Sequence, residues 1–287
     1  MSNMTGSAGE AVSNASDQTE QKARKVNDNP WFERGVRVGL IGYGIVHLLI
    51  GWLALQLAFG DRSGSPDQQG ALQQIAQESY GDALLWTIGI GLLFMAVWQV
   101  FEALWGHTSR DEPKRTIKRV GSAGKVVIYA IVGISSIKFA MEAQSGGKSS
   151  TDSMTADLMK QTAGQWLVAA VGIVIIVVGV MQVKRGVTKS FTKDLTGDAT
   201  SGTSGTAVEK FGQVGYISKG IAVGVVGFLF VWAAWDHDPK KAGGLDTALR
   251  KILDQPFGPV LLGAIALGII AFGLYCFAWA KYADTNS

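Results

Sequence analysis

Residues Gly39 to Phe59 read GLIGYGIVHLLIGWLALQLAF, and this stretch decides the fold class. It runs for 21 residues without Asp, Glu, Lys or Arg. At a rise of about 1.5 Å per residue, a helix of this length covers about 30 Å, the thickness of the hydrocarbon core of a bilayer. The stretch therefore predicts a membrane-spanning helix.

Five further apolar runs predict five more spans, at 83–105, 126–143, 166–183, 220–235 and 257–280. None of these runs has the alternating pattern of a half-buried strand. Charged residues make up 17% of the 287 residues, where a soluble domain carries about 25%. The runs and the composition together predict an all-α integral membrane protein with six transmembrane helices.

A column of residues spaced by four recurs in three of the runs. Its copies are Gly39-Tyr43-His47-Gly51, then Gly121-Lys125-Tyr129-Gly133, then Gly215-Lys219-Val223-Gly227. The first and second copies are 82 residues apart, and the second and third are 94 apart. Residues spaced by four lie on one face of a helix, so each column predicts a face whose terminal glycines pack closely against a neighbouring helix.

The alternate runs repeat at nearly the same offsets, because Gly81 is matched by Gly164 and Gly258. Each repeat is therefore a two-helix hairpin, and three hairpins of equal orientation are related by rotation about the membrane normal. We expect a pseudo-threefold bundle of three parallel hairpins.

Five segments follow from this repetition: a disordered cytoplasmic tail (1–28), repeat 1 (29–106), repeat 2 (107–187), a flexible cytoplasmic linker (188–210) and repeat 3 (211–287). Inside repeats 1 and 3, residues 70–82 and 244–258 place apolar side chains on one helical face, which predicts short amphipathic helices at the membrane surface. Residues 155–164 are a weaker middle copy.

Lys and Arg residues are concentrated on one side of the predicted spans. Eighteen lie on the side of the two termini and seven on the opposite side. Since cytoplasmic loops carry the excess of Lys and Arg, both termini are expected in the cytoplasm. The basic clusters at 114–119 and 184–193 fit this rule, with binding of anionic lipid as the alternative.

His47 lies about halfway along the first span, and an ionisable residue at that depth is a candidate functional site. The structural interpretation is a neutral imidazole that bonds to a neighbouring helix, since an unpaired polar group in hydrocarbon costs several kcal/mol. The functional interpretation is a proton or ligand site. The other residues that might line an intramembrane polar site with His47 are Tyr43, Tyr129, Gln99, Glu102 and Gln182.

Other chemistries find little support in the sequence. The histidines His47, His107 and His237 fall at three different depths, and Cys276 is the single cysteine, so neither a metal site nor a cofactor is expected. No phosphate loop, dinucleotide fingerprint or nucleophile-base pattern occurs in a strand-turn-helix context. We expect no nucleic-acid partner and no enzymatic activity.

The repeats resemble a known family. Their form, G-Y-x-x-x-G with an apolar tail, then G-A-L-x-x-[IL], then Gly and a second span, is similar to the bacterial membrane family called domain of unknown function 1206 from about residue 34 to 282. The second copy departs most, with Gly121-Ser122 where the third has Gly215-Tyr216. The resemblance implies a multi-pass protein of the bacterial cytoplasmic (inner) membrane and adds no catalytic residue.

Two classes of function remain. The first is a non-enzymatic structural or accessory subunit, or a stabiliser, of a larger membrane complex, with the lipid bilayer and other membrane-protein subunits as partners. The second is a small transporter, channel or lipid- or quinone-binding protein with a site near the bundle axis. The apolar character of the last three spans favours the accessory role, because few polar residues are left to line a path.

Overall fold

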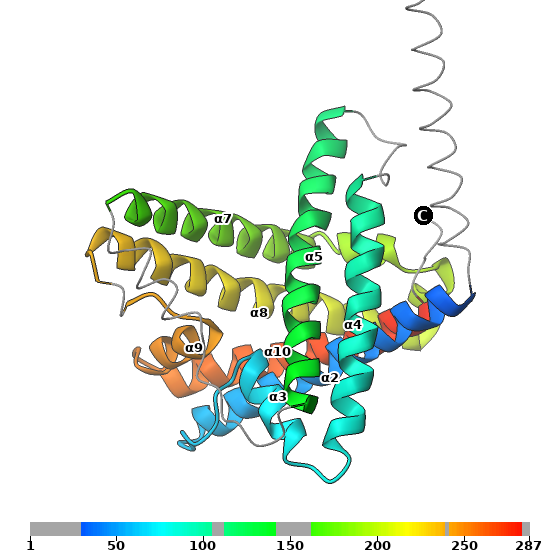
Figure 1. The fold of residues 1–287 in the computed structure, drawn as a ribbon, viewed down its shortest axis with the longest axis horizontal. Helices are drawn as coiled ribbons and strands as arrows, with labels where there is room; N and C mark the ends of the chain where they lie inside the picture. Colours follow the sequence, from blue (N-terminus) through cyan, green and yellow to red (C-terminus); the bar gives the residue numbers. More distant parts are fainter. Residues whose placement is uncertain (1–29, 105–111, 142–161, 239–240, 283–287) are drawn as a thin grey trace, which may run out of the picture.

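The computed structural model describes residues 30–104, 112–141, 162–238 and 241–282. These residues form helices and short 3-10 turns, and no strand (Figure 1). The elements are α2 (Pro30–Ala58), α3 (Gln68–Ala76), α4 (Gly81–Leu104), α5 (Glu112–Met141), α7 (Thr162–Val187), η1 (Ser190–Asp194), η2 (Gly197–Thr200), α8 (Gly202–Trp235), α9 (Leu245–Leu253) and α10 (Gly258–Tyr282).

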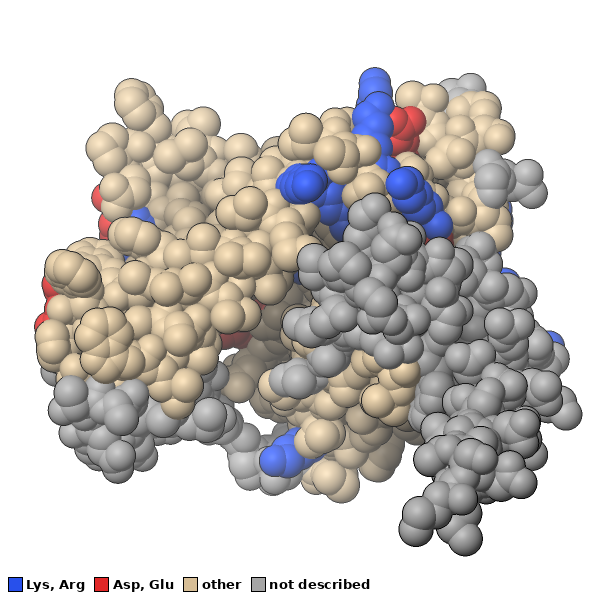
Figure 2. Space-filling model, turned by 90° about the horizontal axis from the view of Figure 1, so that it is seen from above, with Lys and Arg blue, Asp and Glu red and all other residues tan. Residues whose placement is uncertain are grey.

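The predicted fold class is confirmed. Within the described residues, six helices are long and apolar enough to cross a membrane: α2, α4, α5, α7, α8 and α10. They coincide with the six apolar runs but extend beyond them at the polar ends. The helix α2 begins at Pro30, where the fixed φ of proline and its missing N–H suit the first position of a helix. Figure 2 shows a largely uncharged described surface, with most of the visible Lys and Arg side chains gathered in one patch.

The two predicted amphipathic helices are present. In α3 the buried face consists of Ala71, Leu72 and Ile75, and in α9 of Ala248, Leu249 and Ile252. Each contacts both long helices of its own repeat and the first helix of the next repeat, so α3 meets α5 and α9 meets α2. Most of the middle copy, 155–164, lies outside the described residues, as do the tail 1–28 and residue 29.

The long helices keep the cyclic order expected of three repeats. The most extensive pairs join the second helix of one repeat to the first helix of the next: α4 with α5, α7 with α8, and α10 with α2. The two helices of one hairpin also contact each other in repeat 1 (α2 and α4) and in repeat 3 (α8 and α10). Taken in chain order, the six long helices form a ring, and five of its six neighbouring helix pairs are in contact. We call each such pair a side of the ring.

The sixth side, between α5 and α7 of repeat 2, has no comparable contact among the described residues. Figure 1 shows the reason, since α4 and α5 lie side by side and run across the other four long helices. The threefold order thus survives in the contacts, while the ring is open in repeat 2.

Glycines set the close approaches between repeats, as the columns predict. A Cβ atom on Gly51 would lie 3.0 Å from the carbonyl oxygen of Ala266, one on Gly133 3.2 Å from that of Gly89, and one on Gly227 2.7 Å from that of Gly172. These three pairs occupy the same position in the three repeats. Backbones this close leave no room for a larger residue, which is how helices associate in lipid.

The segment 188–210, expected to be a flexible linker, is folded. Residues 190–200 form η1 and η2, and α8 already begins at Gly202. Phe191 is fully buried and Leu195 nearly so. The expectation is corrected because Phe191 and Leu195 anchor this Gly-, Ser- and Thr-rich segment on the helices, although composition alone suggests a mobile chain.

Candidate functional site

The columns of the three first helices meet at the centre of the molecule. Tyr43 of α2 stands edge-on to Tyr129 of α5, with 5.4 Å between ring centroids. Lys219 of α8 reaches the same tyrosine, because its Nζ donates a hydrogen bond to Tyr43 Oη at 2.5 Å. The side chains of Tyr43 and Tyr129 are buried, at 7% and 4% exposure. We name Tyr43, His47, Tyr129, Lys219 and Phe272 the axial cluster.

His47 lies within the axial cluster, one turn along α2 from Tyr43. Its ring centroid is 4.2 Å from that of Tyr43 and 4.9 Å from that of Phe272. Its Nδ1 lies 2.8 Å from the carbonyl oxygen of Tyr43, and since a carbonyl only accepts, Nδ1 carries the proton. The expected bond to a neighbouring helix is therefore replaced by a bond within α2.

Lys219 is held by aromatic rings. Its Nζ lies 4.1 Å from the centroid of Phe272 and 4.7 Å from that of Tyr43, within the range of cation–π attraction. It forms no ion pair with any described carboxylate. The sequence analysis placed Lys219 in the third column but did not predict it as a site residue; its equivalence to Tyr43 was the available signal.

The remaining predicted polar residues do not all join the axial cluster. Gln99 is 2% exposed, and its Oε1 finds no hydrogen-bond partner among the described residues. Gln182 is half-buried on α7, which packs on α8. The side chain of Glu102 lies outside the described part of the chain. Cys276, which shares the repeat position of Gln99 and Gln182, is fully buried against Gly44.

An aromatic cap that the sequence analysis missed covers one end of the axial cluster. Phe191 of η1 stacks on Tyr216 of α8 at 5.3 Å and meets Tyr275 of α10 edge-on at 5.2 Å. Tyr216 in turn contacts Phe272 of the axial cluster. Arg185 of α7 lies 5.0 Å over the Tyr216 ring and pairs with Asp194. Phe191, isolated in a polar segment, was the signal for this cap.

Further bonds fix the segment 190–200, which we call the capping segment, to the long helices. The backbone N–H of Thr196 donates to the carbonyl oxygen of Tyr282 at 2.9 Å, which joins the segment to the end of α10. Lys189 forms an ion pair with Glu209 on the first turns of α8. The segment is thus fixed to α7, α8 and α10 together.

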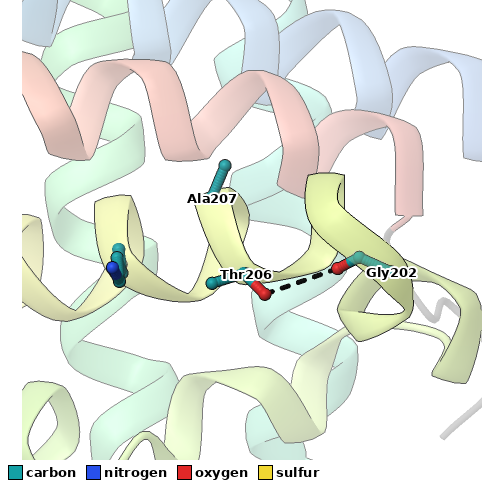
Figure 3. Close-up of a pocket in the computed structure, with 4 residues that line it drawn as sticks. Gly202, Thr206 and Ala207 are labelled. Atoms are coloured by element: carbon teal, nitrogen blue, oxygen red, sulfur yellow. Dashed lines mark hydrogen bonds between the residues drawn. The ribbon is translucent and has the colours of Figure 1, made fainter.

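An open depression lies beyond this cap, at the start of α8. It is lined by Gly202, Thr206, Ala207 and Lys210, and Thr206 Oγ1 donates to the carbonyl oxygen of Gly202 at 3.4 Å (Figure 3). None of these residues belongs to the axial cluster. Within the described residues, no three His, Cys, Asp or Glu side chains gather where they could hold a metal ion.

Outside the spans, Asp67 caps the N-terminus of α3. Its Oδ1 accepts a hydrogen bond from the backbone N–H of Gly70 at 2.8 Å. Burial raises the pKa of the Asp67 carboxyl, and the bond from Gly70 opposes that shift. Nearby, Arg250 of α9 donates to the carbonyl oxygen of Gly64, which links the loop of repeat 1 to that of repeat 3.

The arrangement defines a class: an all-helical protein of three tandem hairpins with six helices fit to cross a membrane and a buried aromatic and basic cluster at their centre. The chain belongs to the family described as Domain of Unknown Function (DUF1206), whose model matches residues 38–106, 120–189 and 214–283. The three matches coincide with the three repeats.

One relative among the curated proteins is the "Uncharacterized protein YxxB" of Bacillus subtilis (strain 168). It is 30% identical over 242 residues, which cover 84% of this chain and 87% of that protein. No solved structure matches.

Proposed function

We propose that the protein is a non-enzymatic, multi-pass protein of the cytoplasmic (inner) membrane that serves as a structural or accessory subunit, or a stabiliser, of a larger membrane complex. The observation that carries this proposal is the filling of the axis by the chain's own side chains. His47 and Tyr129 are 4% exposed and Phe272 is 2% exposed. A transport path or a catalytic site needs space at such a position for a solute or substrate.

Backbone contacts support the same role. The glycine approaches between α2 and α10, and between α7 and α8, hold these helices in fixed pairs. A rigid set of helices with few polar groups is suited to stabilising neighbouring membrane proteins by packing, which is the main source of helix association in lipid.

The test is a pull-down of the tagged full chain from native membranes in a mild detergent, with intact masses measured by native mass spectrometry. We expect one membrane protein at a fixed ratio, and we expect its complex to become less abundant when the chain is deleted and to recover on re-expression. A tagged six-span protein expressed at the same level is the control. A bare monomer, with no change in any complex on deletion, would contradict the accessory role.

A second candidate is a transporter, channel or lipid- or quinone-binding protein. The observation in its favour is that Lys219 and His47 bring two ionisable groups to the axis, where intramembrane ionisable residues commonly serve substrates or protons. The same mass measurement tests it. A lipid or quinone mass retained by the wild-type chain and lost from Lys219→Met would favour this candidate over the accessory role.

A further inference from the structure

The exposed faces of α5 and α7 are the counterparts of two helix faces that contact each other in repeats 1 and 3. In repeat 1, a Cβ atom on Gly39 would lie 2.3 Å from the carbonyl oxygen of Gly91 and 2.7 Å from Met95 Cγ. In repeat 3, one on Gly215 would lie 2.6 Å from the Cα of Phe272. Met95 and Phe272 occupy the same repeat position, so both hairpins close through the same contact.

In repeat 2 the corresponding residues are exposed and apart. Gly121, the counterpart of Gly39 and Gly215, has no described atom within 4 Å of where a Cβ would lie. Val178 is the counterpart of Met95 and Phe272, and Val174 is the counterpart of Gly91. Val174 is 62% exposed and Val178 40%, whereas Met95 is fully buried and Phe272 is 2% exposed.

The next turn repeats the pattern. A Cβ on Gly42 of α2 would lie 3.0 Å from Ile88 Cγ1 of α4. The counterparts are Gly124, where a Cβ would have no atom of the described residues within 4 Å, and Val171, which is 41% exposed. The contact of Gly42 with Ile88 therefore has both of its halves present, and apart, in repeat 2. The contact of Gly39 does not, because Val174 stands where a Cβ on Gly91 would lie 2.6 Å from the backbone nitrogen of Gly39.

A bilayer supplies the reason for these faces to meet. Membrane-spanning helices tilt by at most about 40° from the bilayer normal. Figure 1 shows α4 and α5 running across the other four long helices, and α8 and α10 crossing at a shallower angle. All six apolar helices can cross one bilayer only if the α4–α5 pair turns toward the direction of the others.

We propose that the exposed face of α5 is an interaction surface for α7 of the same chain. In a bilayer the α4–α5 pair turns on α2, and Gly124 packs on Val171 as Gly42 packs on Ile88. The two helices stay further apart at Gly121, because Val174 takes the place of Gly91. This movement closes the sixth side of the ring and encloses the axial cluster. The inference goes beyond the accessory role and does not depend on it.

Disulfide formation between α5 and α7 tests this contact. We would place Gly124→Cys with Val171→Cys in the full chain, with Cys276→Ala to remove the native thiol, and oxidise the purified protein in lipid nanodiscs. In the counterpart of this pair, a Cβ on Gly42 would lie 3.3 Å from the Cβ of Ile88, so the two sulfurs should come within bonding reach when the ring is closed. We expect most of the protein to form the 124–171 disulfide within one chain, identified in a peptide digest.

The matched control is Gly124→Cys with Ile173→Cys, because Ile173 is also exposed on α7 but points about 160° away from Val171 around the helix. It should stay reduced. Because a Cβ on Gly124 meets no described atom, the substitution should leave the folded state intact.

Two results would overturn the proposal. A disulfide between separately tagged Gly124→Cys and Val171→Cys chains, without one inside a single chain, would assign the face to a second copy. Equal, slow oxidation of the test and control pairs in folded protein would mean that α5 and α7 do not meet in lipid. Because the purified chain is used, neither result bears on the partner sought by pull-down.

Discussion

Repeat 3 and repeat 2 contain the same two helical faces, yet only repeat 3 brings them together. Gly215 of α8 lies against Phe272 of α10, while Gly121 of α5 is in contact with no described residue of another helix and Val178 of α7 is 40% exposed. Repeat 3 has a further support, since η1 and η2 bind its two helices at one end. The difference teaches that a hairpin sequence supplies the contact surfaces, while additional anchors fix the angle at which the helices cross.

The largest effect should come from filling the contact of repeat 1. Gly39→Leu places side-chain atoms where the backbone of Gly91 already lies, so α2 and α4 must separate and we expect the protein to be lost from the folded fraction. Gly121→Leu adds a side chain that meets no described atom and should leave folded protein, but it should abolish the disulfide between Gly124→Cys and Val171→Cys in nanodiscs. Size-exclusion chromatography and the yield of helical protein measure the first effect. Equal loss of folded protein from both substitutions would refute the comparison between the two repeats.

Much of this fold could be predicted from the sequence, because each feature that was predicted has a local signal. Long apolar runs with few charged residues indicate the six spans, and the glycine columns indicate which helix faces pack. The open side was not predicted, although the sequence differs there, with Ser122 in place of Tyr216 and Val174 at the position of Gly91. The effect of these differences depends on which helix packs beside them, and that is not a local property of the sequence. Of the axial cluster, Tyr43, His47 and Tyr129 were predicted to share a site, whereas Lys219 and Phe272 joined them through contacts between helices that are distant in sequence.

The second effect concerns η1 and η2, the anchor that is present in repeat 3 and is held by Phe191. Phe191→Ala removes a fully buried aromatic ring, a change that typically costs about 3–5 kcal/mol of stability. Here the loss should release the segment 190–200 from the helices. We expect trypsin to cut after Lys189 and Lys193 at least tenfold faster, while α8 and α10 stay folded. Phe211→Ala, at a ring that is 43% exposed on α8, is the control and should not change the rate. Unchanged cleavage in Phe191→Ala would restore the original prediction of a flexible linker.

The third effect concerns the axial cluster, which lies next to both the closed and the open sides of the ring. A substitution there should reduce the free energy of unfolding by less than Phe191→Ala does. His47→Ala removes a buried ring and its bond to the Tyr43 carbonyl, so we expect a loss of about 1–3 kcal/mol in the free energy of unfolding. His237→Asn, at an exposed histidine with φ of 56°, should be neutral. Thermal unfolding in detergent measures both. If His47→Ala remained fully stable and assembled yet lost a measured proton or solute flux, the accessory role would be wrong.

The smallest effect is expected at Asp67, whose helix α3 contacts α2, α4 and α5 and so lies beside the turning pair. Burial raises the pKa of Asp67 in the folded state above its ordinary value of 3.8. The folded state therefore holds the proton more tightly, and the stability from this group is present at acid pH and is lost as the pH rises through the raised pKa.

Asp67→Asn keeps the cap without the charge, since Asn is an equally good N-cap. We expect its Tm to match the wild type at pH 3 and to exceed it by about 2 °C or less at pH 7. Asp61→Asn should show the opposite sign, because bonds from Ser63 lower the pKa of the exposed Asp61. A wild-type chain that gains stability between pH 3 and pH 7 relative to Asp67→Asn would mean that the bond from Gly70, and not burial, dominates at this carboxyl.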